Sequence, residues 1–420
     1  MKTTIKMPYG CSSKEISIPQ RNINKIYKNI NLNKLEALSD KLLNALEDPI
    51  NSQSLKKLII SQKAKKLCVI ISDNSRANPY RKTLPIILKY VEAAGISPKD
   101  TTILIATGTH PAMTPTEIIN HVGKDLYHRY NIVNHNCKAK DLVNLGRLSS
   151  GNTLKVNKAA VNSDFLITTG IINSHYLAGF SGGRKSILPG IAGYETIRYN
   201  HASVLGKEVK LGAINNNPVN DEMNEALKKV RVDFNISFLL NQEKMINDIF
   251  AGEITSSFES AVNNFIHKFS QKSTAKVPVI LTSPGGYPKD STLYHSQKCI
   301  NNVVESVKKG GSIIVFSKLN KGIGSKEMAR FLRKYNSVKE LLKIPGRAIS
   351  VGGHRAIASA KILQTAEIIF VTENPEINLR ALHFKKYHSW NNCIQHLYKK
   401  YGQEFQCNVI PNGNFFFSKN

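Results

Sequence analysis

Residues 67–72 read LCVIIS, an apolar run that leads directly into the polar residues DNSR at positions 73–76. An apolar, β-branched run of this length is typical of a strand that is buried on both faces of a parallel sheet. Helical periodicity follows from Thr83 to Ala94. This order of strand, turn and helix predicts one unit of an α/β fold.

The same order recurs in two series along the chain. In the first series, TTILIA at 101–106 and DFLITT at 164–169 also end in polar or glycine-rich turns. In the second series a helix is expected over Ser291–Lys308, and the expected strands cover Val277–Thr282, Ser312–Phe316, Ala348–Val351 and Glu367–Val371. We therefore expect two α/β domains with mostly parallel sheets and an active-site cleft between them.

A polar segment, SQKSTAK at 270–276, separates the two series and lacks hydrophobic periodicity. We place the domain boundary there. The N-terminal cofactor-binding and catalytic domain is expected to span 1–272, and the C-terminal domain that closes the cleft 273–420. The last ~18 residues are expected to pack back on the first domain.

The charge of the chain is strongly positive. Among its 420 residues, 58 are Lys or Arg and 30 are Asp or Glu, which gives a formal net charge of +28. Such a charge favours anionic partners. The lysines are scattered, however, and no segment interleaves basic and aromatic residues as nucleic-acid-binding surfaces do. We therefore expect no specific nucleic-acid partner.

The six cysteines form no C-x-x-C pair, which argues against a disulfide scaffold and against a cysteine zinc site. The first 20 residues contain no apolar stretch of signal-peptide length. No run approaches the roughly 20 apolar residues that a membrane helix needs. A cytoplasmic protein without a membrane partner is expected.

Polar side chains gather where the expected strands of the first series end, which is where open α/β sheets bind their ligands. Asp73 and Arg76 follow the first strand, His110 follows the second, and His175 and Lys185 follow the third. A random scatter would place many of these residues on helix faces. The sequence therefore predicts a site at this edge of the sheet.

The segment GFSGGRKS at 179–186 invites comparison with the nucleotide-binding loop G-x-x-x-x-G-K-[ST]. Arg184 occupies the place of the second glycine, and its side chain would crowd a phosphate, which argues against an ATPase. Gly182 and Gly183 still free the backbone to approach a ligand, while Arg184 and Lys185 offer cations to an anion.

Each of these residues also has an ordinary explanation. Asp73 could hold a turn or cap a helix, Arg76 could pair with a surface carboxylate, and His201 could be a partly buried helix histidine. Together, however, His110, His175 and His201 offer two general bases and a candidate metal ligand beside a basic, glycine-rich loop.

The sequence resembles the nickel-pincer-nucleotide lactate racemases over both halves. The similarity is carried by the histidine at position 201 and by five stretches: SDNSRANP (72–79), ATGTHPAM (106–113), VNHN (133–136), NSHYLAGFSGGRKSILPGIA (173–192) and PGGYPKD (284–290).

The resemblance implies a racemase or epimerase of a small-molecule 2-hydroxy acid. Members of this family move the α-hydrogen as hydride to a cofactor, which leaves a planar 2-keto acid, and hydride returns to either face. A base on each side of the substrate takes the hydroxyl proton, and His110 and His175 match these two bases. Arg76 matches the residue that grips the substrate carboxylate.

The implied cofactor is the nickel-pincer nucleotide, the nickel complex of pyridinium-3,5-bisthiocarboxylic acid mononucleotide. Lys185 matches the lysine that joins it through a thioamide, and Arg184 beside it would favour the deprotonated amine. His201 matches the nickel ligand. Asp73 matches a residue near substrate and cofactor, and Lys298 a cation of the second domain that faces the substrate. Proteins of cofactor biosynthesis are implied partners.

Two departures from the family pattern concern the substrate. His295 stands where a substrate-facing glutamine is expected, and residues 351–354 lack an expected tryptophan, since the only one is Trp390. These changes predict a larger, more cationic pocket, so the substrate is lactate or a longer 2-hydroxy acid. A catalytically idle nucleotide-binding homologue and a polyanion-binding protein are the alternatives.

Overall fold

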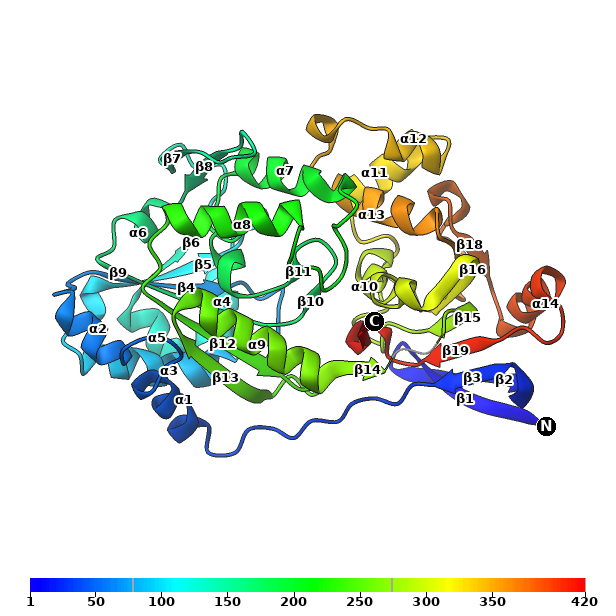
Figure 1. Cartoon of the computed structure of the whole chain (residues 1–420), viewed down its shortest axis with the longest axis horizontal. Coiled ribbons are helices and arrows are strands. Elements are labelled where there is room, and N and C mark those ends of the chain that lie inside the picture. Colours follow the sequence, from blue (N-terminus) through cyan, green and yellow to red (C-terminus); the bar gives the residue numbers. More distant parts are fainter. Residues whose placement is uncertain (78, 273–274, 420) are drawn as a thin grey trace. The chain divides into compact units, whose positions relative to one another are not determined.

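The computed structural model describes residues 1–77, 79–272 and 275–419, which form two compact units (Figure 1). One unit covers Asn31–His267, and the other combines Met1–Ile30 with Lys268–Asn420. We call them the central unit and the terminal unit. Asn78 and the expected boundary at residues 273–274 lie outside the described residues.

The central unit is built on a six-stranded sheet in the order β13-β12-β9-β4-β5-β6. The five strands from β12 to β6 are parallel, and β13 pairs antiparallel with β12 at one edge. These strands are β4 (Leu67–Ser72), β5 (Thr101–Ala106), β6 (Asn131–Asn134), β9 (Phe165–Ile171), β12 (Phe234–Leu240) and β13 (Ile246–Gly252). The strands expected at 67–72, 101–106 and 164–169 are confirmed.

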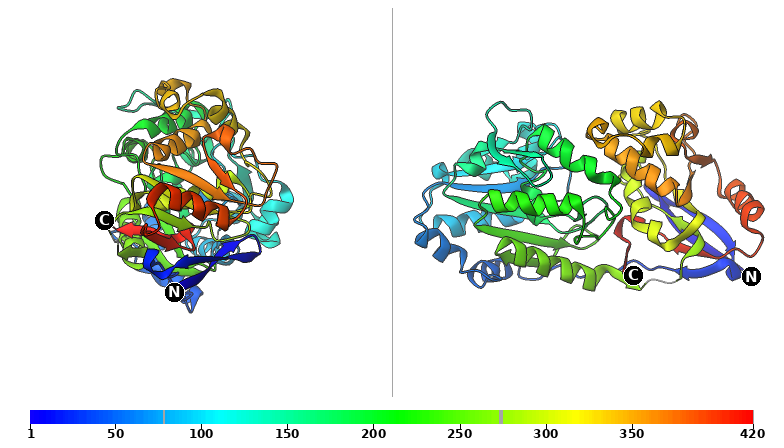
Figure 2. Two further views of the ribbon diagram at one scale, coloured as in Figure 1. Left: turned by 90° about the vertical axis from the view of Figure 1, so that its right-hand side faces the viewer. Right: turned by 45° about the horizontal axis from the view of Figure 1, so that its top comes forward.

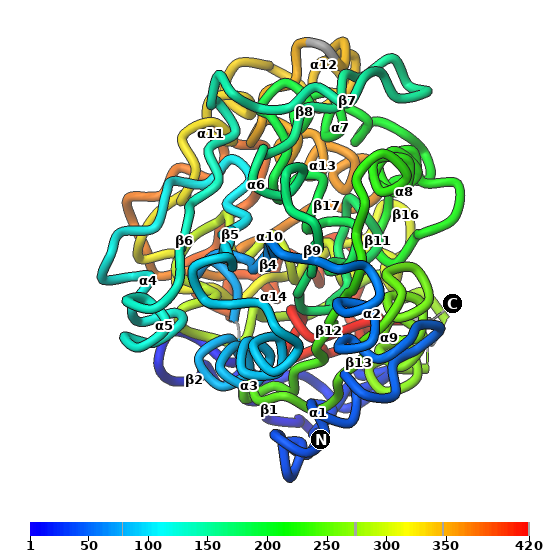
Figure 3. The backbone as a smooth tube through the Cα atoms, turned by 90° about the vertical axis from the view of Figure 1, so that its left-hand side faces the viewer, coloured from blue at the N-terminus to red at the C-terminus, as the bar shows by residue number. Residues whose placement is uncertain are grey.

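Helices cover both faces of this sheet, and Figure 3 traces their backbone. The helices are α1 (Leu38–Glu47), α2 (Leu55–Ser61), α3 (Tyr80–Glu92), α4 (Pro115–Val122), α5 (Lys124–Arg129), α6 (Lys158–Val161), α7 (Tyr194–Ala202), α8 (Pro218–Lys229) and α9 (Ile254–Phe269). In the loops of the central unit β7 (Val143–Arg147) pairs with β8 (Thr153–Val156), and β10 (Ser174–His175) pairs with β11 (Gly179–Phe180). In the terminal unit β14 (Ser270–Lys272) pairs with β20 (Phe417–Lys419).

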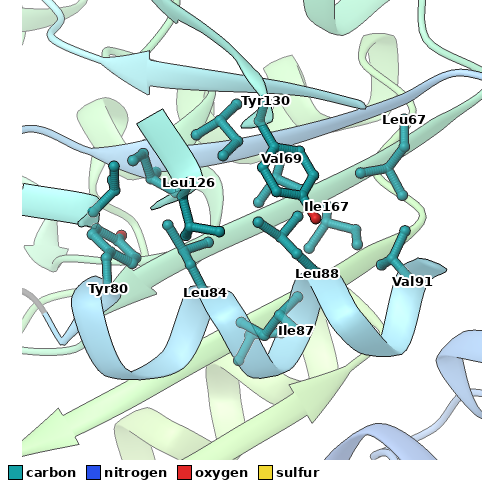
Figure 4. Close-up of a cluster of buried hydrophobic side chains, with 14 of the residues drawn as sticks. Leu67, Val69, Tyr80, Leu84, Ile87, Leu88, Val91, Leu126, Tyr130 and Ile167 are labelled. Carbon is teal, nitrogen blue, oxygen red and sulfur yellow. The ribbon is translucent and has the colours of Figure 1, made fainter. Parts of the chain in front are cut away.

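Alternating residues of the buried strands serve the two faces. On one face Val69 of β4 and Ile167 of β9 meet the apolar side of α3, from which Leu84 and Leu88 point toward the sheet (Figure 4). These side chains are at most 1% exposed. On the opposite face Asn235 of β12 donates to Ser257 of α9 at 2.8 Å. Burial on both faces explains why these strands are continuously apolar.

The terminal unit holds a second six-stranded sheet, in the order β18-β17-β16-β15-β19-β3, whose pairs are all parallel. Its strands are β3 (Ile23–Ile26), β15 (Val277–Thr282), β16 (Val307–Phe316), β17 (Ala366–Val371), β18 (Lys385–Tyr387) and β19 (Cys407–Ile410). Its helices are α10 (Leu293–Val303), α11 (Lys326–Lys334), α12 (Val338–Leu342), α13 (Gly353–Leu363) and α14 (Trp390–Tyr401).

The first 30 residues pack with the C-terminal half, whereas the sequence-based boundary counted them with the first domain. Strands β1 (Lys2–Tyr9) and β2 (Ser12–Pro19) form a hairpin, and β3 pairs with β19. Figure 2 shows the blue N-terminal strands beside the red β19. The C-terminal strand β20 pairs with β14, and both strands belong to the terminal unit.

Two further expectations about the second series are wrong. Ala348–Val351 forms no strand: Gly346–Ala348 is a 3-10 turn that leads into α13. Ile349 is only 1% exposed, so the apolar run signalled burial and not extended pairing. The helix expected to reach Lys308 ends at Val303, because the valines that follow enter β16 at Val307.

Glu367 of β17 holds the most heavily bonded carboxylate in the terminal unit. It accepts from Ser312 at 2.5 Å, from Lys400 at 2.9 Å and from His396 at 3.1 Å, and it pairs with Lys385. Burial acts to raise the pKa of Glu367, but these hydrogen bonds outweigh it and lower the pKa to about 2.

This network predicts a loss of stability in acid. Because the pKa of Glu367 in the folded protein is below that in the unfolded chain, its stabilisation is present above about pH 4.5 and is lost as pH falls towards 2. Glu367→Gln should lower the free energy of unfolding by about 2–3 kcal/mol at pH 7. Urea unfolding at pH 7 and at pH 3.5 should show a smaller difference between the proteins in acid, and a constant difference would contradict this prediction.

Candidate active site

The candidate residues of the central unit lie where the order of its strands reverses. From β4 the chain moves outward to β5 and β6, and it then returns to build β9 and β12 on the other side of β4. The loops after β4 and β9 therefore diverge, and such a switch point is where open α/β sheets bind ligands. Asp73 and Arg76 follow β4, and His175 and Lys185 follow β9.

Asp73 and His110 form a hydrogen-bonded pair across the ends of β4 and β5. The His110 Nδ1 atom lies 2.6 Å from Asp73 Oδ2, and Ser75 donates to Asp73 Oδ1 at 2.6 Å. The Asp73 side chain is 7% exposed, whereas that of His110 is 46% exposed. A carboxylate at Nδ1 fixes the proton of a neutral imidazole on that nitrogen, so Nε2 carries the lone pair that a base needs.

The charge of Asp73 is maintained by its neighbours. Burial acts to raise the pKa of Asp73, but the hydrogen bonds from His110 and Ser75 and the charges of His110 and Arg76 outweigh burial, so the net pKa lies below the usual value. Arg76 is exposed in the same loop, its backbone N–H donates to the Asp73 carbonyl oxygen at 3.5 Å, and its positive charge helps to lower the pKa of Asp73. The structure thus brings Asp73, Arg76 and His110 together.

Two side chains that the sequence analysis did not single out hold the loop after β4 in place. The buried Tyr80 hydroxyl accepts from the Ser72 backbone N–H at 3.0 Å and lies 3.0 Å from Thr169 Oγ1, which links the ends of β4 and β9. His121 Nε2 lies 2.8 Å from the Ser72 carbonyl oxygen. Both residues are on helices and both act through tertiary contacts, so no local pattern could have found them.

The hydrogen bonds of His175 favour the opposite tautomer to that of His110. The backbone N–H groups of Leu177 and Ala178 both donate to its Nδ1 atom, each at 3.2 Å. When the ring is neutral its proton is therefore on Nε2, from which it can donate to an oxygen. The ring is half-buried in the short β10–β11 pair. His110 is thus arranged as an acceptor of a proton and His175 as a donor.

Residues Gly182–Ser186 form a tight turn whose glycines are explained by packing. Gly182 has φ 84°, and an added Cβ would lie 2.5 Å from Ile172 Cδ1. Gly183 has φ 52°, and an added Cβ would lie 2.9 Å from Phe258 Cδ2. Gly183–Ser186 is a 3-10 turn and not the start of a long helix. This geometry agrees with the rejection of a nucleotide-binding P-loop.

Arg184 is the largest polar side chain buried in the core, and it is 2% exposed. Its guanidinium donates to Asn220 and to the carbonyl oxygen of Ala178 at 2.7 Å, and it lies 4.1 Å from the ring centroid of Phe258. Burial lowers the pKa of Arg184 to about 9. Its Nη1 atom is buried and has no acceptor among the described residues. Arg184 therefore braces the loop that carries Lys185.

Lys185 is half-buried at the centre of this turn. Its carbonyl oxygen accepts from Gly190 N–H at 3.0 Å, and the Gly190 carbonyl oxygen accepts from Gly108 N–H at 2.9 Å. The second bond connects the Lys185 turn with the loop that carries His110. His135, from the stretch VNHN, supports the same segment, because its Nε2 atom lies 2.9 Å from the Ala192 carbonyl oxygen.

His201 is half-buried on α7, as expected of a helix histidine. Among residues 1–77, 79–272 and 275–419, no three His, Cys, Asp or Glu side chains are grouped so that they could hold a metal ion. A metal bound to His201 would therefore take most of its donors from a non-protein ligand.

The remaining candidates, His295 and Lys298, are on α10 of the terminal unit. His295 is exposed, and Lys298 is half-buried. Burial first, and then the charges of Arg355 and Lys321, lower the pKa of His295. Trp390 is 8% exposed in the core, where its Nε1 donates to the Ser17 carbonyl oxygen at 3.0 Å.

A doubly wound sheet with a carboxylate–histidine pair and a lysine turn at its switch point defines an α/β enzyme. Residues 9–212 match the family described as the lactate racemase N-terminal domain, and residues 272–416 match the lactate racemase C-terminal domain. The lactate racemase of Thermoanaerobacterium thermosaccharolyticum is 31% identical over 386 residues, and that of Lactiplantibacillus plantarum is 29% identical over 381; each match covers 88% of both chains.

Solved structures agree with these matches. The lactate racemase apoprotein from T. thermosaccharolyticum superimposes with a TM-score of 0.91 at 28% identity over 100% of both chains. A Thermotoga maritima protein gives a TM-score of 0.65 at 19% identity, covers 91% of this chain and 98% of its own, and shares the fold. The chain belongs to the lactate racemase family. It is an isomerase of the racemase type. No helix among the described residues is long and apolar enough to span a membrane.

Proposed function

We propose that this protein racemises or epimerises a 2-hydroxy acid, lactate or a longer one, by hydride transfer with a nickel-pincer nucleotide. The observation that carries the proposal is the pair of His110 and Asp73 beside Arg76, in a chain of the lactate racemase family. It supplies a base and a carboxylate-binding cation in one place, and a 2-hydroxy acid needs both.

Arg76 binds the carboxylate of the substrate in this proposal, because its planar guanidinium can form two parallel hydrogen bonds with a carboxylate. His110 takes the hydroxyl proton at Nε2, and Asp73 holds the ring in the required tautomer and stabilises the imidazolium that results. Lys298 binds the substrate as a further cation, and His295, whose pKa is lowered, binds it as a hydrogen-bonding partner. A 2-keto acid forms when hydride leaves.

His175 acts on the other enantiomer. Its Nε2–H donates to the substrate oxygen and so polarises the keto group. To accept the hydroxyl proton at Nε2, the ring must carry its other proton on Nδ1, which requires the two backbone hydrogen bonds to Nδ1 to open. We therefore expect the two directions of the reaction to differ in their dependence on pH.

The residues of the loop after β9 fit an anionic nucleotide. Arg184 has a buried Nη1 without an acceptor, and a buried donor in this state favours an additional anion or carbonyl nearby. Lys185 in the adjacent position would hold the cofactor covalently, with Asp73, Gly182 and Gly183 around it. His201 would donate an imidazole nitrogen to nickel. When bound, the nickel-pincer nucleotide supplies the hydride acceptor.

We further propose that the protein acts in the cytoplasm and receives its cofactor from biosynthesis proteins. All six cysteines are free thiols, as in a reducing compartment. An expression host for functional tests must therefore contain the genes of cofactor synthesis.

Mass spectrometry of the full chain, co-expressed with the cofactor-synthesis proteins, tests the proposed function. We expect an added mass on the peptide that contains Lys185, nickel equimolar with the chain, and conversion of enantiopure 2-hydroxy acids to mixtures on a chiral column. Lys185→Ala should abolish all three, while Lys207→Ala, a change at an exposed lysine of the central unit, should leave them unchanged. An active enzyme without the adduct would refute the cofactor assignment. A loaded protein that converts no 2-hydroxy acid would be the idle homologue.

A further inference from the structure

Helix α7, which carries His201, is held in place mainly by polar groups. Its buried side chains are Thr196, Ile197 and Asn200, so only one of the three is apolar. A surface helix of a globular protein usually packs through an apolar stripe. Hydrogen bonds are directional, whereas apolar contacts are not, so polar contacts of this kind fix the rotation of α7 about its axis and with it the direction of His201.

The hairpin of β7 and β8 provides one set of these contacts. The Thr196 hydroxyl donates to the Thr153 carbonyl oxygen at 2.6 Å, and the Tyr199 hydroxyl donates to the Ser150 carbonyl oxygen at 2.5 Å. The Asn152 side chain donates to the Thr196 carbonyl oxygen at 3.0 Å. Three residues of the hairpin therefore bind α7.

Helix α8, which lies beside α7 in Figure 1, provides the other set. Asn200 precedes His201 and is fully buried. Its Nδ2 atom donates to Glu222 Oε2 at 2.7 Å and to the Val219 carbonyl oxygen at 3.1 Å. Glu222 also accepts a hydrogen bond from the Ser150 hydroxyl. The Glu222 carboxylate thus joins α7, α8 and the hairpin at one point.

The burial of Glu222 calls for an explanation. Its exposed fraction is 5%, and the side chains of Ser150 and Asn200, which donate to it, are neutral. Burying a carboxylate among neutral groups opposes folding. The stability of the fold therefore does not explain this residue, whereas the orientation of α7 does.

Helix α8 also holds the loop that carries Lys185. Asn220 accepts a hydrogen bond from the guanidinium of Arg184, which precedes Lys185 in the chain. Asn217 caps the helix and donates to the Leu177 carbonyl oxygen at 3.0 Å. A single helix therefore contacts both the loop after β9 and α7.

We propose that Glu222 is a positioning residue, which orients α7 so that His201 and Lys185 serve the same bound cofactor. The inference rests on the proposed function, in which Lys185 holds the cofactor covalently and His201 donates to its nickel. A covalent bond persists when a neighbouring helix shifts, whereas a metal–imidazole bond depends on the distance and angle of the ring. Loss of Glu222 should therefore loosen the nickel and spare the adduct on Lys185.

Nickel release to EDTA and the mass of the Lys185 peptide test the proposal, in the full chain co-expressed with the cofactor-synthesis proteins. Glu222→Met removes both acceptor oxygens at similar size. It should keep the adduct and release nickel at least about tenfold faster than the wild type, because residues that orient a metal ligand contribute about 10–100-fold to metal affinity. Glu222→Gln keeps an acceptor for Asn200, so its release should stay within about threefold of the wild type.

Glu225→Gln is the matched control. Glu225 is on the same helix and accepts from the Ser149 backbone N–H at 2.8 Å and from the Ser149 hydroxyl at 2.6 Å, so these contacts are with the hairpin. This variant should leave nickel release and the absorption spectrum of the bound nickel unchanged, whereas Glu222→Met should alter both.

Asn200→Ala removes the other end of the hydrogen bond. It should release nickel as Glu222→Met does, and the double variant should be no worse than either single variant, since the two residues act through one contact. Thermal melting shows which variants are folded. Nickel release like that of the wild type in Glu222→Met and Asn200→Ala, with the adduct present, would overturn the positioning role and leave the racemase function standing. Loss of the adduct together with the nickel would also overturn it.

A measurement without cofactor separates the two proposals. Hydrogen exchange of the full chain, followed by mass spectrometry of its peptides, should be at least about tenfold faster in α7 of Glu222→Met than in the wild type and unchanged in α3. If the wild type carried no nickel, the cofactor assignment would fail, and faster exchange in α7 would still support Glu222 as the residue that orients this helix. Unchanged exchange in α7 would overturn the positioning role.

Discussion

Replacing His110 or His175 with alanine is expected to slow racemisation by at least about a hundredfold, because each ring handles the hydroxyl proton of one enantiomer. His110 has the more direct case, since its Nδ1 is paired with Asp73 and its Nε2 has the lone pair of a base. Initial rates from each enantiomer, normalised to bound cofactor, measure the effect.

Two variants serve as controls for this experiment. Asp73→Asn keeps the size of the side chain but removes the charge that fixes the His110 tautomer, so it should lower kcat and alter the pH profile. His128→Ala removes an exposed histidine of α5 and should have no effect. If His110→Ala and His175→Ala both racemised at the rate of the wild type, neither ring would be the base.

The second large effect is expected from Gly190→Ala. An added Cβ would lie 2.2 Å from the Ser186 carbonyl oxygen and 2.9 Å from that of Lys185, and backbone cannot yield as a flexible side chain can. The variant should therefore lose about 3 kcal/mol or more of stability and open the turn that carries Lys185. Thermal melting and the mass of the Lys185 peptide report the two consequences.

Gly206→Ala is the comparison for that variant. Its added Cβ would have its nearest neighbours at 3.1–3.2 Å, and two of these three are side-chain atoms of Val209 and Pro218. It should be much milder in both measurements. If Gly190→Ala melted like the wild type and still carried the adduct, the tight turn would have no part in holding the lysine.

The central strands could be predicted from the sequence because their physics is local. LCVIIS, TTILIA and VPVILT are apolar except for Ser or Thr at their ends, and only a strand covered on both faces needs such a run. The site at the strand ends follows from the same reasoning, which is why Asp73 and His110, 37 positions apart, could be expected near each other before their 2.6 Å contact was seen.

What the sequence could not predict depends on contacts between distant segments. Strand β3 is short and alternates half-buried with exposed residues, so nothing local assigns it to β19. Tyr80 and Arg355 are ordinary helix residues until the fold places their polar groups beside Ser72 and Tyr294. The sequence predicts that Arg184 offers a cation to a ligand. In the structure its guanidinium instead donates to Asn220 and to the Ala178 carbonyl oxygen.

The pairing of β3 with β19 has a consequence for biosynthesis. The central unit is contiguous in the chain and can fold as soon as its last helix leaves the ribosome. Strand β3, by contrast, must wait for Cys407–Ile410, which are synthesised long after it. Until then the nascent chain carries β3 as an unpaired strand, and an unpaired strand can pair with strands of other chains. A late step of folding therefore pairs β3 with β19 after the central unit has folded.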